Sequence, residues 1–147
     1  LARRVRVPSR VPDVRDVAVL ADLLGAEYAV VYGYGVAGAA LRGADRSAAV
    51  RGWDRHRAAR DGFEGRLVAE RSPVPQAPAA YDLPFPVGDS GAARRLLALL
   101  EDRLAAHWLA GVQRVGRKQR RPLVEGLTDA ALAAARWRDG SVAFPGR

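Results

Sequence analysis

The sequence predicts an all-α fold, a four-helix bundle with a long crossover between its second and third helices. Four long stretches place apolar side chains at alternating spacings of three and four residues, which is the pattern of helices that pack against other helices. A proline-rich stretch of 19 residues separates the second stretch from the third, whereas the other connections are short. Short, long and short connections in that order are typical of a bundle whose crossover runs along its length.

Length and composition agree with one compact domain. The chain has 147 residues, of which 49% are apolar, enough to form a full core. We expect residues 1–12 to form an extended basic arm, because two prolines and four arginines discourage a packed helix. Residues 13–147 are expected to form a single domain. The absence of cysteine excludes disulfides, thiolate metal sites and cysteine nucleophiles from this chain.

The first helix is expected over residues 14–41, with Asp13 as its N-cap and Asp16 in its first turn. Gly25 and Gly33 fall inside it, which indicates either the close approach of another helix or a kink. Its apolar seam contains one carboxylate. The seam consists of Val17, Leu20, Leu24, Glu27, Val31 and Tyr34.

The second helix is expected over residues 46–70, with Asp45 or Ser47 as its cap. Two polar side chains interrupt its seam, which consists of Ala49, Trp53, His56, Arg60, Phe63 and Leu67. Residues 72–90 then contain five prolines and cannot be helical throughout. We expect part of this crossover to lie extended against the helices, because apolar side chains alternate between Tyr81 and Val87.

The third helix is expected to begin after Asp89 or Ser90 and to end near Gly116. Its seam is Ala93, Leu97, Leu100, Leu104, His107 and Gly111, and Glu101 flanks it. Residues 113–121 read as a basic connector. The fourth helix is expected to begin at or before Pro122 and to end at Asp139–Gly140, followed by a tail whose Val142 and Phe144 pack back.

Five ionisable side chains fall on or beside these seams near the middle of the bundle. They are Glu27, His56, Arg60, Glu101 and His107. A buried charge is costly unless it is paired or coordinated. We expect Arg60 to pair with Glu27 or Glu101, assisted by His56, because a guanidinium is always charged and forks onto a carboxylate. Such a buried polar cluster could fix helix register without adding net stability.

Six segments carry a family resemblance. They are Ala26–Gly35, His56–Asp61, Leu83–Val87, Leu100–Ala106, Ala135–Arg138 and Ala143–Gly146. Through these segments the chain resembles the ferritin-like superfamily and, more narrowly, a bacterial ferritin-like family of unknown function. The resemblance covers nearly the whole chain after the arm and implies a ferritin-like bundle without implying an established activity.

The resemblance also implies where a metal would bind. Ferritin-like two-metal bundles take a Glu from one helix of each pair and a Glu-x-x-His from the other. Glu27, His56 and Glu101 would then be ligands for iron or manganese. However, Trp53 stands where a Glu should precede His56, and the fourth helix contains no His, so three of six expected ligands remain.

These observations lead to two hypotheses about function. The first is a non-catalytic structural or interaction protein without a cofactor, in which an ion cluster fills a degenerate two-metal site. The second is a metal-dependent oxidoreductase or metal-storage protein that uses iron or manganese. Self-association into a homo-oligomer through the helical faces is compatible with either hypothesis.

A second alternative rests on charge. The formal net charge is +8, and a cationic surface attracts phosphate. The candidate phosphate contacts are Arg114, Arg117, Lys118, Arg120 and Arg121. No aromatic residues accompany them and no DNA-binding motif surrounds them, so we expect a solvated loop and consider nucleic-acid binding the weaker interpretation.

Location is inferred from what the sequence lacks. No run of about 18 uncharged apolar residues occurs, so we expect no membrane segment in this chain. The lack of cysteine favours a cytoplasmic protein. The chain begins at Leu1 and contains no Met, so we interpret it as a processed or trimmed product, and an upstream targeting segment stays compatible with it.

Overall fold

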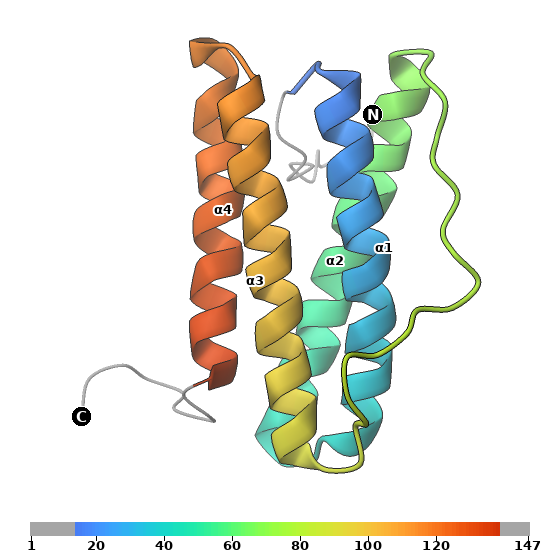
Figure 1. The fold of residues 1–147 in the computed structure, drawn as a ribbon, viewed down its shortest axis with the longest axis vertical. Helices are drawn as coiled ribbons and strands as arrows, with labels where there is room; N and C mark the ends of the chain where they lie inside the picture. The colour runs from blue at the N-terminus through green and yellow to red at the C-terminus, as the bar shows by residue number, and fades with distance from the viewer. Residues whose placement is uncertain (1–13, 139–147) are drawn as a thin grey trace, which may run out of the picture.

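Four long helices form the protein in a computed structural model that describes residues 14–138 (Figure 1). They are α1 (Val17–Ala40), α2 (Gly43–Ala69), α3 (Ser90–Arg114) and α4 (Arg117–Arg138). No strand occurs within residues 14–138, so the predicted all-α four-helix fold is confirmed. The predicted arm 1–12, the predicted cap Asp13 and the tail with Val142 and Phe144 lie outside the described residues.

The helices pack in the spatial order α2, α1, α3, α4. The backbone of α1 lies against both α2 and α3, and α4 lies against α3. In Figure 1, α1 and α4 run downward while α2 and α3 run upward, so each packed pair is antiparallel. Residues 70–89 connect α2 to α3, close to the predicted crossover 72–90, and descend along the bundle from the end of α2 to the start of α3.

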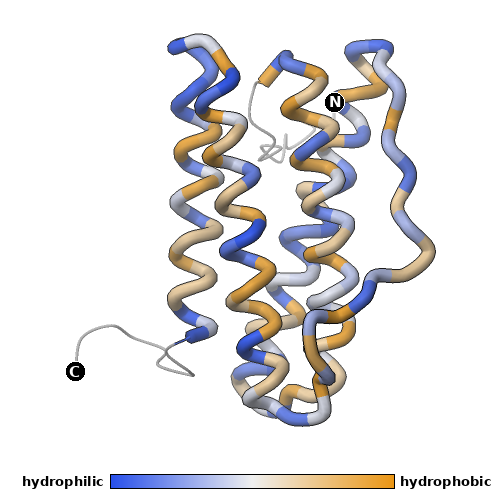
Figure 2. Tube along the Cα trace, in the orientation of Figure 1, coloured by the Kyte–Doolittle hydropathy of each residue, from blue (hydrophilic) through white to orange (hydrophobic). Residues whose placement is uncertain are grey.

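Apolar side chains from these helices and from the crossover form one core. The fully buried residues include Leu20, Leu23 and Leu24 of α1, Phe63 and Leu67 of α2, Leu96 and Leu97 of α3, and Leu123 of α4. Leu83, Phe85 and Val87 of the crossover pack against this core. Figure 2 shows the corresponding hydrophobic residues along the helices and in the lower part of the crossover.

A tyrosine on α1 holds the upper part of the crossover. The Tyr28 hydroxyl lies 2.7 Å from Oε1 of Glu64 on α2 and 3.0 Å from the carbonyl oxygen of Pro75. Burial and the hydrogen bond to Glu64 raise the pKa of Tyr28 to about 12, so its hydroxyl remains a donor at neutral pH. The crossover is thereby fastened to both helices of the first hairpin.

Helix capping follows the predicted chemistry but differs in position. The Asp16 carboxylate, not Asp13, caps α1 by accepting from two backbone N–H groups, and Asp89 caps α3 as predicted. The prediction that Asp45 or Ser47 caps the second helix is wrong. That helix begins at Gly43, and Asp45 instead accepts from Nε of Arg94 on α3 at 2.8 Å.

The predicted basic connector 113–121 is mostly helical. Helix α3 continues to Arg114 and α4 begins at Arg117, so only Val115 and Gly116 join them. Pro122 accordingly sits inside α4. It is the sixth residue of this helix, so its missing N–H removes one bond of the helical ladder, the one to the carbonyl of Lys118.

Close approach, and not a kink, explains the glycine within the first helix. A Cβ added at Gly33 would lie 2.1 Å from Cδ1 of Leu100 on α3, whereas Gly25 and Gly35 have open space. Helix α1 runs without interruption from Val17 to Ala40. Gly33 therefore marks the contact between α1 and α3.

Among the described residues, α1 is the one helix long and apolar enough to cross a membrane by length and composition. The buried core helix of a soluble protein can be equally long and apolar, and so can a signal sequence. In this chain, 44% of an 18-residue stretch of α1 is buried inside the bundle. The described residues therefore contain one weak candidate and no clear membrane span.

Candidate functional site

Three ionisable side chains meet inside the bundle, one from each of α1, α2 and α3. Glu27, His56 and Glu101 are 2%, 5% and 0% exposed and are the buried polar or charged residues within 14–138. Nδ1 of His56 lies 2.8 Å from Oε2 of Glu27, and its Nε2 lies 2.9 Å from Oε1 of Glu101. The imidazole therefore bridges two carboxylates and uses both of its nitrogens.

Two aromatic side chains extend this arrangement to the fourth helix. The Tyr34 hydroxyl on α1 donates to Oε1 of Glu101 at 2.5 Å, and Nε1 of Trp137 on α4 donates to the Tyr34 oxygen at 3.0 Å. We call Glu27, His56, Glu101, Tyr34 and Trp137 the buried polar network. Its hydrogen bonds connect all four helices in one continuous chain.

A glycine on α2 makes room for this network. Gly52 lies one helical turn before His56, so both face the same side of α2. A Cβ added at Gly52 would lie 2.4 Å from Cε1 of Tyr34. Because Gly52 has no side chain, the Tyr34 ring rests on the backbone of α2 with its centroid 5.0 Å from the His56 ring.

Burial and hydrogen bonding act in opposite directions on His56. Burial alone would lower its pKa, but the hydrogen bonds to Glu101 and Glu27 outweigh burial and raise it to about 9. Burial raises the pKa of Glu27, and the bond to His56 opposes that shift. At neutral pH His56 thus remains an imidazolium. Its two N–H groups donate to the carboxylates of Glu27 and Glu101.

A partly exposed arginine balances the remaining negative charge. Two carboxylates and one imidazolium leave one negative charge, and a terminal nitrogen of Arg55 lies 3.7 Å from Oε1 of Glu101. The other oxygen of Glu101, Oε2, is buried and has no hydrogen-bond partner among residues 14–138. The network is therefore nearly neutral and contains one unsatisfied acceptor.

The expectation that Arg60 belongs to the buried cluster is corrected by the structure. Its guanidinium bonds the neighbouring Asp61 at the surface, with Nε 2.8 Å from Oδ1. Since His56 is already protonated and Arg55 approaches from the rim, a guanidinium in the core would have no carboxylate left to neutralise. The flexible Arg60 side chain therefore remains with the exposed carboxylate beside it.

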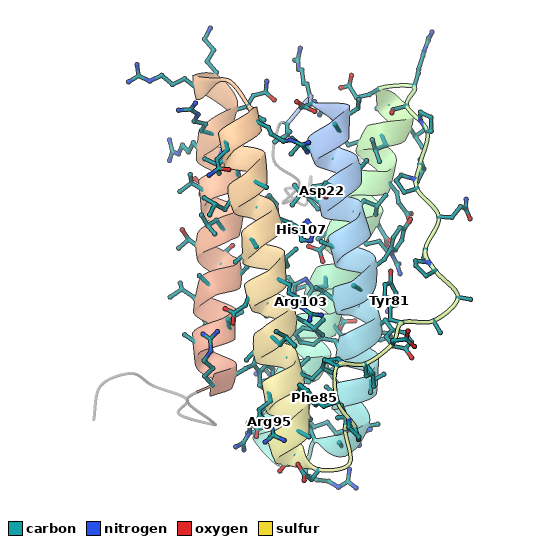
Figure 3. All side chains as sticks on the ribbon, in the orientation of Figure 1. Asp22, Tyr81, Phe85, Arg95, Arg103 and His107 are labelled. Atoms are coloured by element: carbon teal, nitrogen blue, oxygen red, sulfur yellow. The ribbon has the colours of Figure 1, made fainter. Side chains whose placement is uncertain are left out.

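His107 is also outside the cluster. Its Nδ1 lies 2.8 Å from Oδ2 of Asp22, and both side chains are about two-fifths exposed (Figure 3). Six residues turn a helix by about 600°, so His107 and Glu101 lie on different faces of α3. The apolar spacing placed His107 on the seam, but that side of α3 meets the edge of α1.

The five candidate phosphate contacts surround the turn between α3 and α4. Arg121 pairs with Glu125 one turn further along α4, with Nε 3.2 Å from Oε1, and both side chains are largely exposed. Nε of Arg120 lies 3.4 Å from the carbonyl oxygen of Val115. Four of the five, Arg117, Lys118, Arg120 and Arg121, lie in α4 rather than in a loop.

Sequence reasoning missed three contributors. Tyr34 lies in the same predicted seam as Glu27, two turns further on, but its spacing gives no sign of its hydrogen bonds. Trp137 belongs to the fourth helix, and its spacing gives no partner for its indole N–H. A signal for both was available, because a buried Tyr or Trp usually finds a hydrogen-bond partner. Arg55 lies just outside the predicted seam of α2, and no spacing signal identifies it.

The fold and this network define the protein as a four-helix domain whose core holds a hydrogen-bonded set of acidic and basic groups. Residues 19–147 match the family described as a domain of unknown function, DUF4439, and the chain belongs to that family. All five residues of the buried polar network lie within the matched region.

A solved structure resembles this chain. The chain is similar to a conserved hypothetical protein, Rv2844, from Mycobacterium tuberculosis, with a TM-score of 0.77 and 32% sequence identity. The match covers 85% of this chain and 96% of that chain. No curated protein gives a significant match.

Proposed function

We propose that this protein is a non-catalytic, ferritin-like structural or interaction domain in which protonated side chains take the place of a metal centre. The observation that carries the proposal is the bridging position of His56, whose two ring nitrogens both bond carboxylates. A ligating imidazole must present a bare nitrogen to a metal. Here each nitrogen is already committed to a glutamate.

The donor set does not fit a two-metal site. The buried residues of α4 are Leu123, Ala130, Ala133 and Ala134, which contain no ligating group. Within the described residues, no group of three or more His, Asp or Glu side chains is arranged to hold a metal ion. The cluster is also close to charge balance without a cation, because His56 and Arg55 oppose the two glutamates.

The proposed role of the network is to fix the register of the helices. Its bonds join α1 to α2, α2 to α3, α3 to α1 and α1 to α4, so sliding any helix by one turn would break at least one of them. A buried ion cluster often adds little net stability compared with apolar packing. The network instead selects a single arrangement of the four helices, because their apolar seams alone specify the register weakly.

Metal binding is the second candidate, and one observation favours it. Oε2 of Glu101 is buried without a hydrogen-bond partner in the described part of the chain, and unsatisfied buried acceptors are rare unless an ion, water or proton fills them. Iron or manganese at this position would require His56 to release one glutamate. Glu27, His56 and Glu101 would then be its ligands.

Metal analysis separates these candidates. Protein purified without chelator should contain no stoichiometric iron or manganese, and Glu27→Gln should have the same metal content as the parent protein. Glu27→Gln preserves side-chain shape, which keeps the comparison informative if Glu27→Ala fails to fold. Stoichiometric metal that is lost in Glu27→Gln would overturn the proposal in favour of metal binding.

The wider biological role follows from the same proposal. Exposed apolar residues on the helices, including Leu109, Val124 and Leu132, suit self-association or contact with another protein. We place the protein in the cytoplasm. Its basic α3–α4 turn is interpreted as a solvated surface, and nucleic-acid association remains the weaker alternative, which strong binding with a steep salt dependence would favour.

A further inference from the structure

A hollow of about 420 Å³ lies at the surface between the first half of α3 and the end of α4. Ala98, Leu99 and Trp137 supply its apolar lining, and three arginines and one aspartate, Arg94, Arg95, Arg138 and Asp102, supply its polar lining. Its volume falls within the range of about 300–1,000 Å³ that is usual for small-molecule pockets. The role proposed for the buried polar network does not require this hollow.

The ion pairs around the hollow leave one guanidinium unneutralised. Arg94 is held by Asp45, and Arg138 pairs with Asp102. Within residues 14–138, no carboxylate lies within ion-pair distance of Arg95. Its guanidinium carbon is 5.8 Å from the centroid of Phe85, beside the start of α3 (Figure 3). Of the three guanidinium groups that line the hollow, that of Arg95 is therefore the one without an ion pair to the described residues.

The apolar wall of the hollow is fixed in orientation. Nε1 of Trp137 donates to the Tyr34 hydroxyl, so the indole is held with its polar edge toward the core while the residue also lines the hollow. Gly91, which has no side chain, also lines the hollow. A Cβ added there would be 3.4 Å from Oδ1 of Asp89 and 3.5 Å from a terminal nitrogen of Arg95. A flat ligand could thus contact the indole while its charge reaches Arg95.

From this juxtaposition we propose that the hollow between α3 and α4 binds a small organic anion with an apolar body, such as an aromatic carboxylate. Arg95 binds the carboxylate, since a guanidinium offers two parallel N–H donors. Trp137, Leu99 and Ala98 bury the body of the ligand. The inference goes beyond the proposed structural role and does not depend on whether the core holds protons or a metal.

Benzoate is the probe for the experiment, and the full chain is titrated in a buffer without organic anions. The indole N–H signals of the three tryptophans report binding in a proton–nitrogen NMR spectrum, and Trp137→Phe identifies the Trp137 signal. We expect benzoate to shift that signal in a saturable manner. Acetate, which lacks the apolar body, and benzylamine, which carries the opposite charge, should give no saturable shift.

Two variants test the role of the unneutralised guanidinium. Arg95→Gln should weaken benzoate binding about tenfold, as expected for the loss of a charged hydrogen-bond partner. Arg57→Gln is the matched control, because Arg57 also stacks over an aromatic ring, 4.5 Å from the Trp53 centroid, but on α2. The proposal fails if benzoate gives no saturable Trp137 shift, if benzylamine matches benzoate, or if both variants weaken binding equally.

Discussion

Glu27 of α1 and His56 of α2 share a hydrogen bond of 2.8 Å in the interior of the bundle, where both side chains are almost completely buried. The imidazole reaches a second glutamate with its other nitrogen, so neither carboxylate lies in the core without a cationic partner. The cost of burying each charge is thereby offset by hydrogen bonds to the others.

Removing Glu27 should destabilise the protein strongly. Glu27→Ala would leave His56 with an unpaired ring nitrogen in the core, and breaking a buried ion pair from one side costs about 3–5 kcal/mol. Chemical denaturation at pH 7 measures this change. The control is Glu125→Ala, which removes an exposed carboxylate from its pair with Arg121 and should cost less than about 1 kcal/mol. Equal losses in the two variants would contradict the burial of Glu27.

Removing the Tyr34 hydroxyl should affect two partners at once. Tyr34→Phe takes a donor from Glu101 and an acceptor from the Trp137 indole, and an unsatisfied buried group costs about 1–3 kcal/mol. Tyr32→Phe is the matched control, because the Tyr32 ring contacts Tyr81 while its hydroxyl has no hydrogen bond to the described residues. Thermal unfolding should show a lower Tm for Tyr34→Phe alone. Indistinguishable Tm values would remove Tyr34 from the network.

The close packing of Tyr34 on α2 can be tested by adding one methyl group at Gly52. In Gly52→Ala the new Cβ would lie 2.4 Å from the Tyr34 ring, so the ring or α2 must move, and overpacking of this kind costs about 1–3 kcal/mol. Gly35→Ala adds the same methyl group where nothing lies within 4 Å and should stabilise α1 by up to about 1 kcal/mol. Opposite signs in denaturation are expected, and a stabilising Gly52→Ala would contradict the packing.

The stability of the protein should fall as the pH rises from about 6.5 to about 9. In this range folded His56, with its pKa raised to about 9, retains a proton that the unfolded side chain, with a pKa near 6.5, has released. The contribution is complete below pH 6.5 and is lost as the pH rises through the folded pKa. The difference amounts to about 3 kcal/mol.

The raised pKa of Glu27 acts in the same direction, because an acid whose folded pKa is raised loses stability as the pH rises above its unfolded value. His56→Gln is the control for this prediction. Its unfolding free energy should fall less between pH 6.5 and 9 than that of the parent, because the His56 proton is gone and only Glu27 of the pair is left to titrate. Parallel pH profiles for parent and variant would show that His56 is not the titrating group.

The sequence predicts the four helices, the crossover and the three central residues of the network for one physical reason. An amphipathic seam has a fixed period, so a Glu or His at a seam position must enter the core wherever the helix packs. Glu27 and His56 follow this rule. Glu101, which flanks its seam, is buried because α3 packs against both α1 and α4.

The partners of these residues are less predictable than their burial. Periodicity predicts the helix face on which a residue lies. A long side chain, however, can reach several charged groups, and the period does not say which of them it bonds. Arg60 bonds Asp61 at the surface for this reason, and Arg55 reaches Glu101 from a position that the seam does not include. The hydrogen bond from Trp137 to Tyr34 depends on how α4, which packs against α3, is placed relative to α1, and no local sequence pattern encodes that.

The protonation of His56 is the central claim, and nitrogen NMR of its imidazole measures it most directly. With the protein labelled with ¹⁵N, His56→Gln assigns the two ring signals, and His107 serves as an internal reference at the surface. We predict that both His56 nitrogens carry protons at pH 7 and that they titrate together with a pKa of about 9. A bare His56 nitrogen at pH 7, or one whose signal moves when iron or manganese is added, would contradict the account.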